Sequence, residues 1–539
     1  MPFRSILFDR AEDEGASHAE APDCFRDLRL DQVVASITAG REDYALTPIF
    51  HRPLKRIESI RCRHEIFGDL EDRALAVDVA SFGTEMQAVR ERIARSEKAY
   101  YVLQQQRWFL DALMLYGEAV GRLARSLNAA GLGSSVLGAF RDYLAEYLRS
   151  DELVRMLAQA KAVDRELAAI RYELRIEGRQ IEVRACSASA TGAAGLPDSE
   201  QACTGAAGRA DEASDYAAEV ARTFRKFERD GAREYRFRFH DYPQINHVEA
   251  AILERVARLF PREFAALAAF REAHRNALDP LIVRFDREVQ FYLACLGHVE
   301  RLRRTGLEFC YPEVTDRSKA VCAEAAFDLA LAAALAADGK PVVTNDFALD
   351  GAERILVVTG ANQGGKTTFA RAFGQLHYLA ALGCPVPGRR ALLFAFDEIY
   401  THFEREEAVG TLSGKLEEEL VRMHRILEAA TPRSILIMNE SFGATTLADA
   451  LYLGRRVLQR IVERDMLGVC VTFLDELAAL GRATVSLVSQ VAPDDPAVRT
   501  FKIIRQPANG LAHALAIARK YRLSYEDVRE RLAAGVHPP

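Results

Sequence analysis

The stretch Gly360-Ala361-Asn362-Gln363-Gly364-Gly365-Lys366-Thr367 decides the fold of the second half of this chain. It fits G-x-x-x-x-G-K-[ST], in which backbone amides close around phosphates, the lysine reaches the β and γ oxygens, and the final hydroxyl ligates Mg²⁺. An apolar run at 355–358 precedes it, and residues 368–373 read as the start of a helix. A strand, a glycine loop and a helix thus follow one another. This order favours a nucleotide site built from Gly360 to Thr368 over a simple tight turn.

Length and composition indicate a globular protein of several domains. The chain has 539 residues, 27% of them charged and 49% apolar. The net charge of −6 excludes a global basic field, so any DNA-binding surface must be local. The nine cysteines include no C-x-x-C pair, which fits reduced thiols better than a disulfide or zinc framework. The most apolar segment, 325–337, is too short to span a bilayer. We therefore expect a cytoplasmic protein with no membrane partner and no signal peptide.

The first half of the chain has the periodicity of helices. Short helices broken near Pro53 are expected over 28–70, and two or three long helices over 79–174, with a turn at residues 131–134. Residues 248–305 are again helical in pattern and carry Arg and Lys against Glu. Such two-sided polar helices suit levers or arms better than a compact core.

Between these helices the pattern changes. Residues 172–183 alternate with a period of two, and a hairpin turning at Glu177-Gly178 is expected. The Ala/Gly/Ser-rich segment 187–214 reads as a loop. Residues 235–240 alternate aromatic and basic side chains, so they form either a DNA-contacting strand or a half-buried strand with a solvated face.

After Pro312, short apolar runs alternate with helical segments. This texture predicts an α/β sheet wrapped by helices, with a domain boundary near residue 315. The expected strands are 341–343, 355–358, 391–396, 435–438, 469–473, 485–488 and 500–504.

Hydrolysis needs an acidic group near Mg²⁺ and a residue that orients water. The apolar run 435–438 ends in Asn439-Glu440. Glu440 is the candidate water-orienting base, and an ordinary strand-end carboxylate is the alternative. Asn439 stands where an aspartate would hold the metal, so Asn439 and Thr367 are the candidate Mg²⁺ ligands. Ser413 precedes a helix and acts either as its cap or as a contact to the γ-phosphate of a second subunit.

These segments resemble, in order, the motifs of the MutS family of DNA mismatch-repair ATPases. The family's N-D…T-G-P-N-x-G-G-K-S-T block resembles 344–347 with 358–368, and its M-D-E resembles 438–440. Residues 413–420 stand where the family places its S-T-F-x-x-E-M motif, whose serine contacts ATP on the partner subunit. Further similarity covers R-P-L at 52–54, I-x-x-R at 60–63, G-x-x-V-P at 383–387 and D-x-I-F-T at 397–401, and a C-terminal helix at 510–518.

The resemblance implies an α+β multidomain chain, in which a long-helix lever and clamp region is followed by an α/β P-loop ATPase domain of ABC-like, MutS type. The implied segments are core and lever helices (1–182), a reduced clamp-like insert (183–240), returning levers (241–315) and the ATPase domain with dimerisation helices (316–539). It also implies ATP and Mg²⁺ as cofactors, DNA as partner, and a homodimer in which Ser413 acts in trans.

This sequence also departs from the family pattern. It lacks the F-x-E mismatch-reading wedge and a nuclease-like C-terminal extension, Asn439 replaces the metal aspartate, and Phe473 replaces a switch histidine. We therefore expect a short, divergent MutS-related protein without the mismatch-reading domain, which uses ATP to drive a clamp on DNA in mismatch repair or a related process. The alternative is a nucleotide-gated interaction protein with little hydrolysis. A chromosome-organising or transport-type ATPase shares the loop, but the order of the other motifs argues against it.

Overall fold

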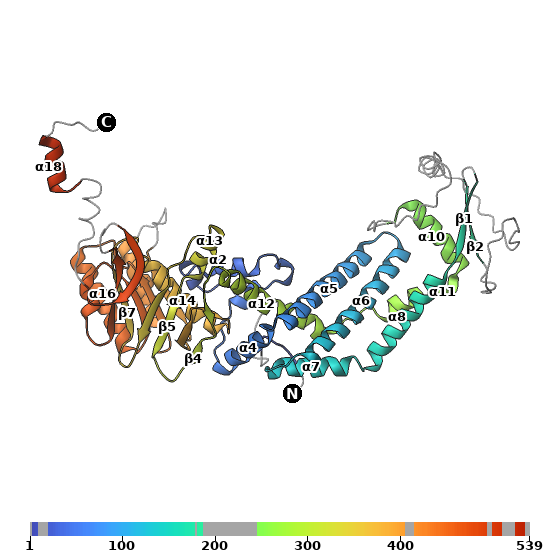
Figure 1. The fold of residues 1–539 in the computed structure, drawn as a ribbon, viewed down its shortest axis with the longest axis horizontal. Coiled ribbons are helices and arrows are strands. Elements are labelled where there is room, and N and C mark those ends of the chain that lie inside the picture. The colour runs from blue at the N-terminus through green and yellow to red at the C-terminus, as the bar shows by residue number, and fades with distance from the viewer. Residues whose placement is uncertain are drawn as a thin grey trace. The chain divides into compact units, whose positions relative to one another are not determined.

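The computed structural model describes residues 3–8, 20–177, 180–186, 245–404, 414–492, 498–508 and 523–533. They fall into two compact units (Figure 1). Unit 1 combines Met1–Ala76, Gly131–Phe140 and Arg284–Pro539, and unit 2 combines Val77–Ala130 and Arg141–Val283. The boundaries of these two units differ from those of the four segments expected from the sequence. The expected boundaries stay a prediction.

The described residues of unit 2 form helices and one hairpin. The turn expected at residues 131–134 separates α6 from α7, and a further break separates α7 from α8, where the Ser150 hydroxyl caps α8 by accepting from the Leu153 amide. The expected hairpin is confirmed, with Ile176 opposite Ile181. The elements that lie wholly or partly in unit 2 are α5 (Arg73–Lys98), α6 (Val102–Ala129), α7 (Ser135–Tyr147), α8 (Asp151–Ala169), β1 (Tyr172–Glu177), β2 (Gln180–Ala185), α10 (His247–Leu259), α11 (Pro261–Ala273) and α12 (Pro280–Arg303), and most of α12 belongs to unit 1.

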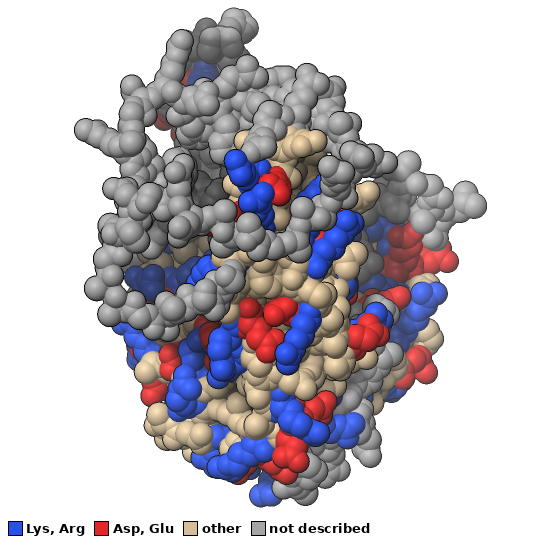
Figure 2. Space-filling model, turned by 90° about the vertical axis from the view of Figure 1, so that its right-hand side faces the viewer, with Lys and Arg blue, Asp and Glu red and all other residues tan. Residues whose placement is uncertain are grey.

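Charges of both signs are mixed on the surface of this region. Arg107 lies 2.7 Å from Asp164, and Arg122 lies 2.7 Å from Glu85. In the face drawn in Figure 2, Lys and Arg side chains are interspersed with Asp and Glu side chains among the coloured residues. Such pairs contribute little to stability individually, but they neutralise local fields.

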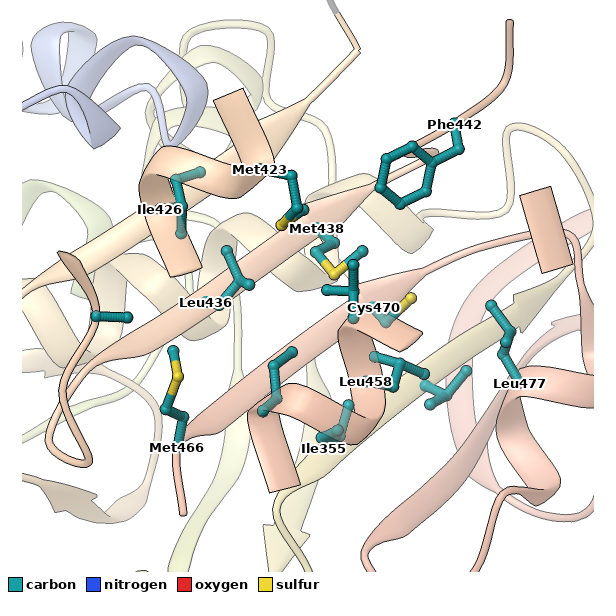
Figure 3. Close-up of a cluster of buried hydrophobic side chains, with 14 of the residues drawn as sticks. Ile355, Met423, Ile426, Leu436, Met438, Phe442, Leu458, Met466, Cys470 and Leu477 are labelled. Atoms are coloured by element: carbon teal, nitrogen blue, oxygen red, sulfur yellow. The ribbon is translucent and has the colours of Figure 1, made fainter. Parts of the chain in front are cut away.

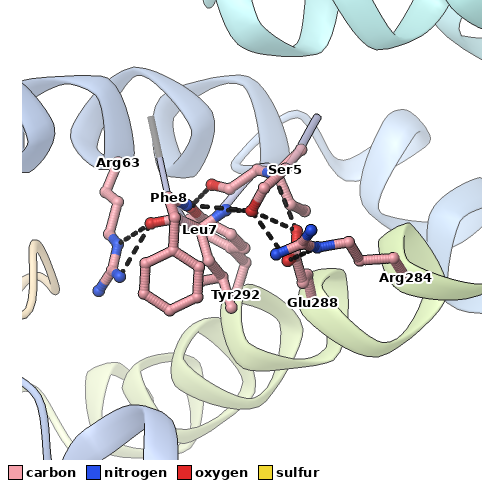
Figure 4. A network of polar contacts seen from close by, with 8 residues as sticks. Ser5, Leu7, Phe8, Arg63, Arg284, Glu288 and Tyr292 are labelled. Atoms are coloured by element: carbon pink, nitrogen blue, oxygen red, sulfur yellow. Dashed lines mark hydrogen bonds and ion pairs between the residues drawn. The ribbon is translucent and has the colours of Figure 1, made fainter. Parts of the chain in front are cut away.

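Short helices open unit 1, as expected, and the chain is non-helical on both sides of Pro53. Figure 4 shows how the N-terminal segment is held: the Ser5 hydroxyl contacts the buried Glu288 carboxylate at 2.8 Å, and Glu288 also accepts from Arg284 at 2.7 Å. The helices are α1 (Cys24–Asp27), α2 (Leu30–Thr38), α3 (Thr47–Phe50) and α4 (Ile57–Leu70), with a short 3-10 turn at Glu42–Tyr44.

Arg63 on α4 ties the N-terminal segment to the end of α14 (Lys366–Ala381). Its guanidinium is buried and donates to the Leu7 carbonyl at 3.0 Å and to the Leu382 carbonyl at 2.7 Å. The next residue, Gly383, has φ +70°, and a Cβ there would lie 2.7 Å from the Arg63 side chain. Both the conformation and the close approach therefore require glycine.

The main sheet of unit 1 has the order β10-β11-β12-β7-β13-β14. All neighbours are parallel except β13 and β14, which are antiparallel. A second sheet has the order β4-β9-β5-β6, and β3 pairs with β8. The strands are β3 (Phe309–Cys310), β4 (Glu313–Thr315), β5 (Val321–Ala326), β6 (Asn345–Leu349), β7 (Ile355–Gly360), β8 (Val386–Pro387), β9 (Arg390–Phe394), β10 (Ile399–Phe403), β11 (Ile435–Asn439), β12 (Leu467–Val471), β13 (Thr484–Val491) and β14 (Arg499–Arg505).

Helices cover this sheet and complete its core. Figure 3 shows Met423 and Ile426 of α15, and Leu458 of α16, against Leu436 and Met438 of β11 and its neighbours. These side chains are at most 8% exposed, so the packing fixes both helices to the strands that carry the site. Among the described residues of unit 1, the remaining helices are α13 (Leu329–Ala337), α15 (Lys415–Ala429), α16 (Leu447–Glu463), α18 (Tyr525–Ala533) and a 3-10 turn, η3 (Asp475–Ala479).

The mixed α+β class is confirmed, whereas the lever and clamp arrangement stays a prediction. All but one of the expected apolar runs are strands. The exception is 341–343, which is not a strand; β6 begins at Asn345 instead. Pro341 has no N–H to give to a ladder, which disfavours pairing there. Within the described ranges, no helix is both long and apolar enough to cross a membrane.

Candidate nucleotide-binding site

The carboxyl ends of three neighbouring strands meet at one edge of the main sheet. In the strand register, Val358 of β7 lies opposite Val471 of β12, and Val471 lies opposite Asn439 of β11. The glycine loop after β7 and the Asn439-Glu440 pair are therefore brought to the same edge. In open α/β sheets, ligands bind at this edge.

Glycines shape the loop because no other residue fits. Gly360 has φ +105°, and a Cβ there would lie 2.9 Å from the Ser489 carbonyl oxygen. A Cβ on Gly364 would lie 2.0 Å from the Ser489 hydroxyl. Gly365 has φ +91° and is the N-cap of α14, so Lys366 opens the helix. The expected strand, loop and helix are present. At Gly360 and Gly364 the backbone approaches β13 too closely for a side chain, whereas at Gly365 the positive φ favours glycine.

Lys366 is held at the base of the loop. Its ammonium donates to the carbonyls of Gly360 at 3.0 Å and Ala361 at 3.1 Å and lies 4.7 Å from the centre of the Phe473 ring. Burial lowers its pKa, and the negative charge of Glu440 opposes this shift. The interaction of a cation with a ring face is worth about 0.5–1 kcal/mol at exposed sites. Phe473 thus interacts directly with the lysine that the motif assigns to phosphates.

Thr367 and Asn439 form the part of the site that fits a magnesium ion. The Thr367 hydroxyl donates to the Asn439 Oδ1 at 2.8 Å. Mg²⁺ prefers oxygen ligands and takes one or two from the protein, with the others coming from phosphates and water. No cluster of three or more His, Cys, Asp or Glu side chains suited to a metal occurs among the described residues. The residues fit a nucleotide-borne Mg²⁺ held by two neutral oxygens, with the negative charge supplied by the phosphates.

Glu440 directly follows β11 and is held in a left-handed conformation. Its φ is +53°, and its amide donates to the Val471 carbonyl at 2.9 Å. Burial raises the pKa of its carboxyl group, the Lys366 ammonium lowers it, and Glu404 raises it. A positive φ is uncommon for a residue with a side chain and is found at functional sites when the surroundings hold it. The Glu440 carboxylate thus lies close enough to the Lys366 ammonium for the two charges to interact.

Ser489 and Arg499, which sequence reasoning did not single out, brace the loop, and Asn345 of the expected N-D block contacts β14. The Ser489 hydroxyl donates to the Gly364 carbonyl at 2.8 Å, and Arg499 Nε donates to the Asn362 carbonyl at 3.0 Å. Asn345 bridges to β14 by accepting from the Ile503 amide at 2.8 Å. Ser489, a small polar residue at the end of a buried apolar run, was the only one with a visible signal beyond family resemblance. The antiparallel β13–β14 pair thus supports one wall of the site.

Other predicted features lie outside the described residues. These are Ser413, the C-terminal helix at 510–518, the loop at 187–214 and the alternating segment 235–240. The neighbouring Gly414 is described and is the N-cap of α15. The role of Ser413 in trans stays a prediction.

The fold and site define a P-loop nucleotide-binding domain. Residues 356–520 match the family model described as MutS domain V. The chain is 28% identical over 213 residues to "Endonuclease MutS2" of Gemmatimonas aurantiaca, covering 37% of this chain and 25% of that protein. It is 30% identical over 194 residues to "Endonuclease MutS2" of Thermus thermophilus, covering 36% and 26%. Over 243 residues it is 27% identical to "DNA mismatch repair protein MutS" of Granulibacter bethesdensis, covering 44% and 26%.

Residues 356–520 thus match a MutS-type domain, and over this part the chain is similar to MutS and MutS2 proteins. The match spans about a quarter of the length of these relatives. The resemblance first seen in the motifs is therefore confirmed for the nucleotide-binding domain.

Proposed function

We propose that this chain is an ATPase of MutS type that acts on DNA as a homodimer, in mismatch repair or a related repair or recombination process. The observation that carries the proposal is the meeting of Lys366, Thr367, Asn439 and Glu440 at one sheet edge. A phosphate-binding lysine, metal-facing oxygens and a water-orienting carboxylate are the parts that nucleotide hydrolysis requires.

Each residue has a distinct part in the proposed reaction. The backbone from Gly360 to Thr368 and the Lys366 ammonium bind the phosphates. Thr367 and Asn439 would hold Mg²⁺ through their side-chain oxygens, and the ion would supply positive charge to the phosphates. Glu440 orients the attacking water, and its raised pKa suits a group that accepts a proton. Ser413 of one subunit completes the site of the other.

DNA enters the proposal through the relatives, two of which are called MutS2 endonucleases and one a mismatch-repair protein. The test is ATP turnover measured with homoduplex, mismatched and branched DNA, together with gel shifts over a salt series. Because phosphate contacts release counterions, DNA affinity must fall as salt rises. Lys366→Ala is expected to abolish nucleotide binding, whereas Glu440→Ala is expected to bind ATP without turning it over. Absence of salt-dependent binding to every DNA would overturn the DNA assignment.

The second candidate is a nucleotide-gated interaction protein with little hydrolysis. The uncharged Asn439 favours it, because an amide brings no negative charge to the metal. The two functions differ in turnover: a gated binder holds Mg·ATP with negligible phosphate release, and its Glu440→Ala variant behaves as the parent does. A drop in turnover in that variant excludes the second candidate.

A further inference from the structure

A buried network connects the end of β10 with the segment that follows Glu440. His402 on β10 is fully buried, and its Nδ1 lies 2.8 Å from the Ser441 hydroxyl. Its Nε2 lies 3.1 Å from the carbonyl of Glu419 on α15. The Glu419 carboxylate, 8% exposed, accepts from the Phe442 amide at 2.8 Å. Ser441 and Phe442, which follow Glu440, are thus held by side chains of β10 and α15, two elements distant in sequence.

The tautomer of His402 follows from its partners. A backbone carbonyl only accepts hydrogen bonds, so Nε2, which faces the Glu419 carbonyl, carries a proton. In the neutral ring Nδ1 is then an acceptor, and it accepts a hydrogen bond from the Ser441 hydroxyl at 2.8 Å, closer than the His402 carbonyl at 3.2 Å. One side chain thereby connects α15 to the turn after β11.

The turn needs such support because its backbone is strained. Glu440 has φ +53° and Phe442 has φ +64°, both unfavourable for residues with side chains. These conformations persist only where surrounding contacts fix them. Here the Glu440 amide donates to the Val471 carbonyl, and the Phe442 amide donates to the Glu419 carboxylate. The Phe442 ring also packs in the core beside β11 (Figure 3).

Helix α15 also contacts the end of β10. It begins at Lys415, whose ammonium lies 2.7 Å from Glu404 at the end of β10. Glu419 is the next turn of the same helix, and Ser413 precedes the helix by two residues. A shift of α15 therefore changes the anchor of the Phe442 amide.

We infer that His402 and Glu419 are positioning residues, which hold the turn at 440–442 so that the Glu440 carboxylate faces the γ-phosphate water, and which transmit the position of α15 to it. This inference rests on the proposed function. It does not require either side chain to touch ATP. Loss of either side chain should lower ATP turnover and not nucleotide affinity, because β13 and β14 support the phosphate-binding loop separately.

The test compares Glu419→Ala with Glu419→Gln, whose amide oxygen still accepts from the Phe442 amide. Binding of a fluorescent Mg·ATP analogue, ATP turnover and thermal unfolding are measured on the full chain for both variants and for His402→Ala. The matched control is His298→Ala, which removes another buried histidine of unit 1, one located on α12. We expect Glu419→Ala and His402→Ala to lower kcat by about tenfold, corresponding to the loss of one positioning hydrogen bond, with nucleotide affinity changed less than about twofold. Glu419→Gln restores most of the rate.

The outcomes separate the inference from the proposed function. If the parent protein binds no nucleotide, or binds it without turnover, the hydrolase assignment fails and the inference fails with it. If the parent turns ATP over and Glu419→Ala does so equally well, the inference is overturned and the hydrolase assignment stands. A rate loss that Glu419→Gln does not restore, or one that His298→Ala shares, assigns the network to stability alone and also overturns the inference.

Discussion

Asn439 is uncharged, whereas nucleotide hydrolases carry an acidic group near Mg²⁺. Its Oδ1 accepts the Thr367 hydroxyl at 2.8 Å. Asparagine and aspartate have the same shape, so Asn439→Asp adds a negative charge at the proposed Mg²⁺ site without changing the packing. We expect the Mg²⁺ concentration for half-maximal turnover to fall about tenfold, a gain of about 1.4 kcal/mol.

The matched control for that change is Asn439→Ala, which removes the acceptor and is expected to raise the Mg²⁺ requirement. The measurement is ATP turnover in a Mg²⁺ titration. An unchanged requirement in both variants would show that residue 439 does not face the metal.

Glu440 predicts how turnover depends on pH. A base acts when deprotonated, and burial raises the pKa of this carboxyl group above its ordinary value. Turnover should therefore be lost on acidification at a higher pH than for an exposed glutamate. Measured between about pH 5 and 8, kcat should show this acid limb, and the residual rate of Glu440→Gln should lack it. The same limb in that variant would assign the titration to another group.

At the scale of the element, the loop between β7 and α14 depends on its contact with β13. In Gly364→Ala the new Cβ would lie 2.0 Å from the Ser489 hydroxyl and 2.9 Å from the Ala361 carbonyl oxygen. Overpacking of this kind costs about 1–3 kcal/mol. We expect Mg·ATP affinity to fall by about tenfold or more, measured with a fluorescent analogue.

Gly138→Ala is the control for that substitution. Gly138 lies within α7, and a Cβ added there would have no neighbour within 4 Å, so alanine should stabilise the helix by about 0.5–1 kcal/mol and leave nucleotide affinity unchanged. Equal Mg·ATP affinities in the two variants would mean that the loop and Ser489 accommodate the new Cβ at residue 364 without loss of binding free energy.

The elements also show what the sequence can and cannot predict. The loop, α14 and the buried strands β7, β11 and β12 were predictable because each is a local pattern of glycines or continuous apolar residues. Strand β10 was not predicted because its residues include Tyr400, Thr401 and His402, which do not form an apolar run. The bracing by Ser489 and the network through Glu419 join residues far apart in the chain, and no local pattern records such pairs.

At the scale of the molecule, the two compact units predict two responses to nucleotide. The predicted site lies wholly in unit 1, and the single tryptophan, Trp108, lies on α6 in unit 2. Tryptophan fluorescence therefore reports the unfolding of unit 2 alone, whereas circular dichroism reports both units. A ligand that binds only the folded site stabilises that unit by RT ln(1 + [L]/Kd), about 2.7 kcal/mol at a hundredfold excess over Kd.

We expect saturating Mg·ATP to raise the unfolding midpoint of one dichroism transition by a few degrees and to leave the fluorescence midpoint of Trp108 in place. Lys366→Ala serves as the control, because without nucleotide binding neither midpoint should move. A shift of the Trp108 midpoint as large as that of the dichroism transition would contradict independent units. It would mean that unfolding of the helical unit is coupled to the nucleotide site, so that binding energy from Lys366 and its loop reaches α6.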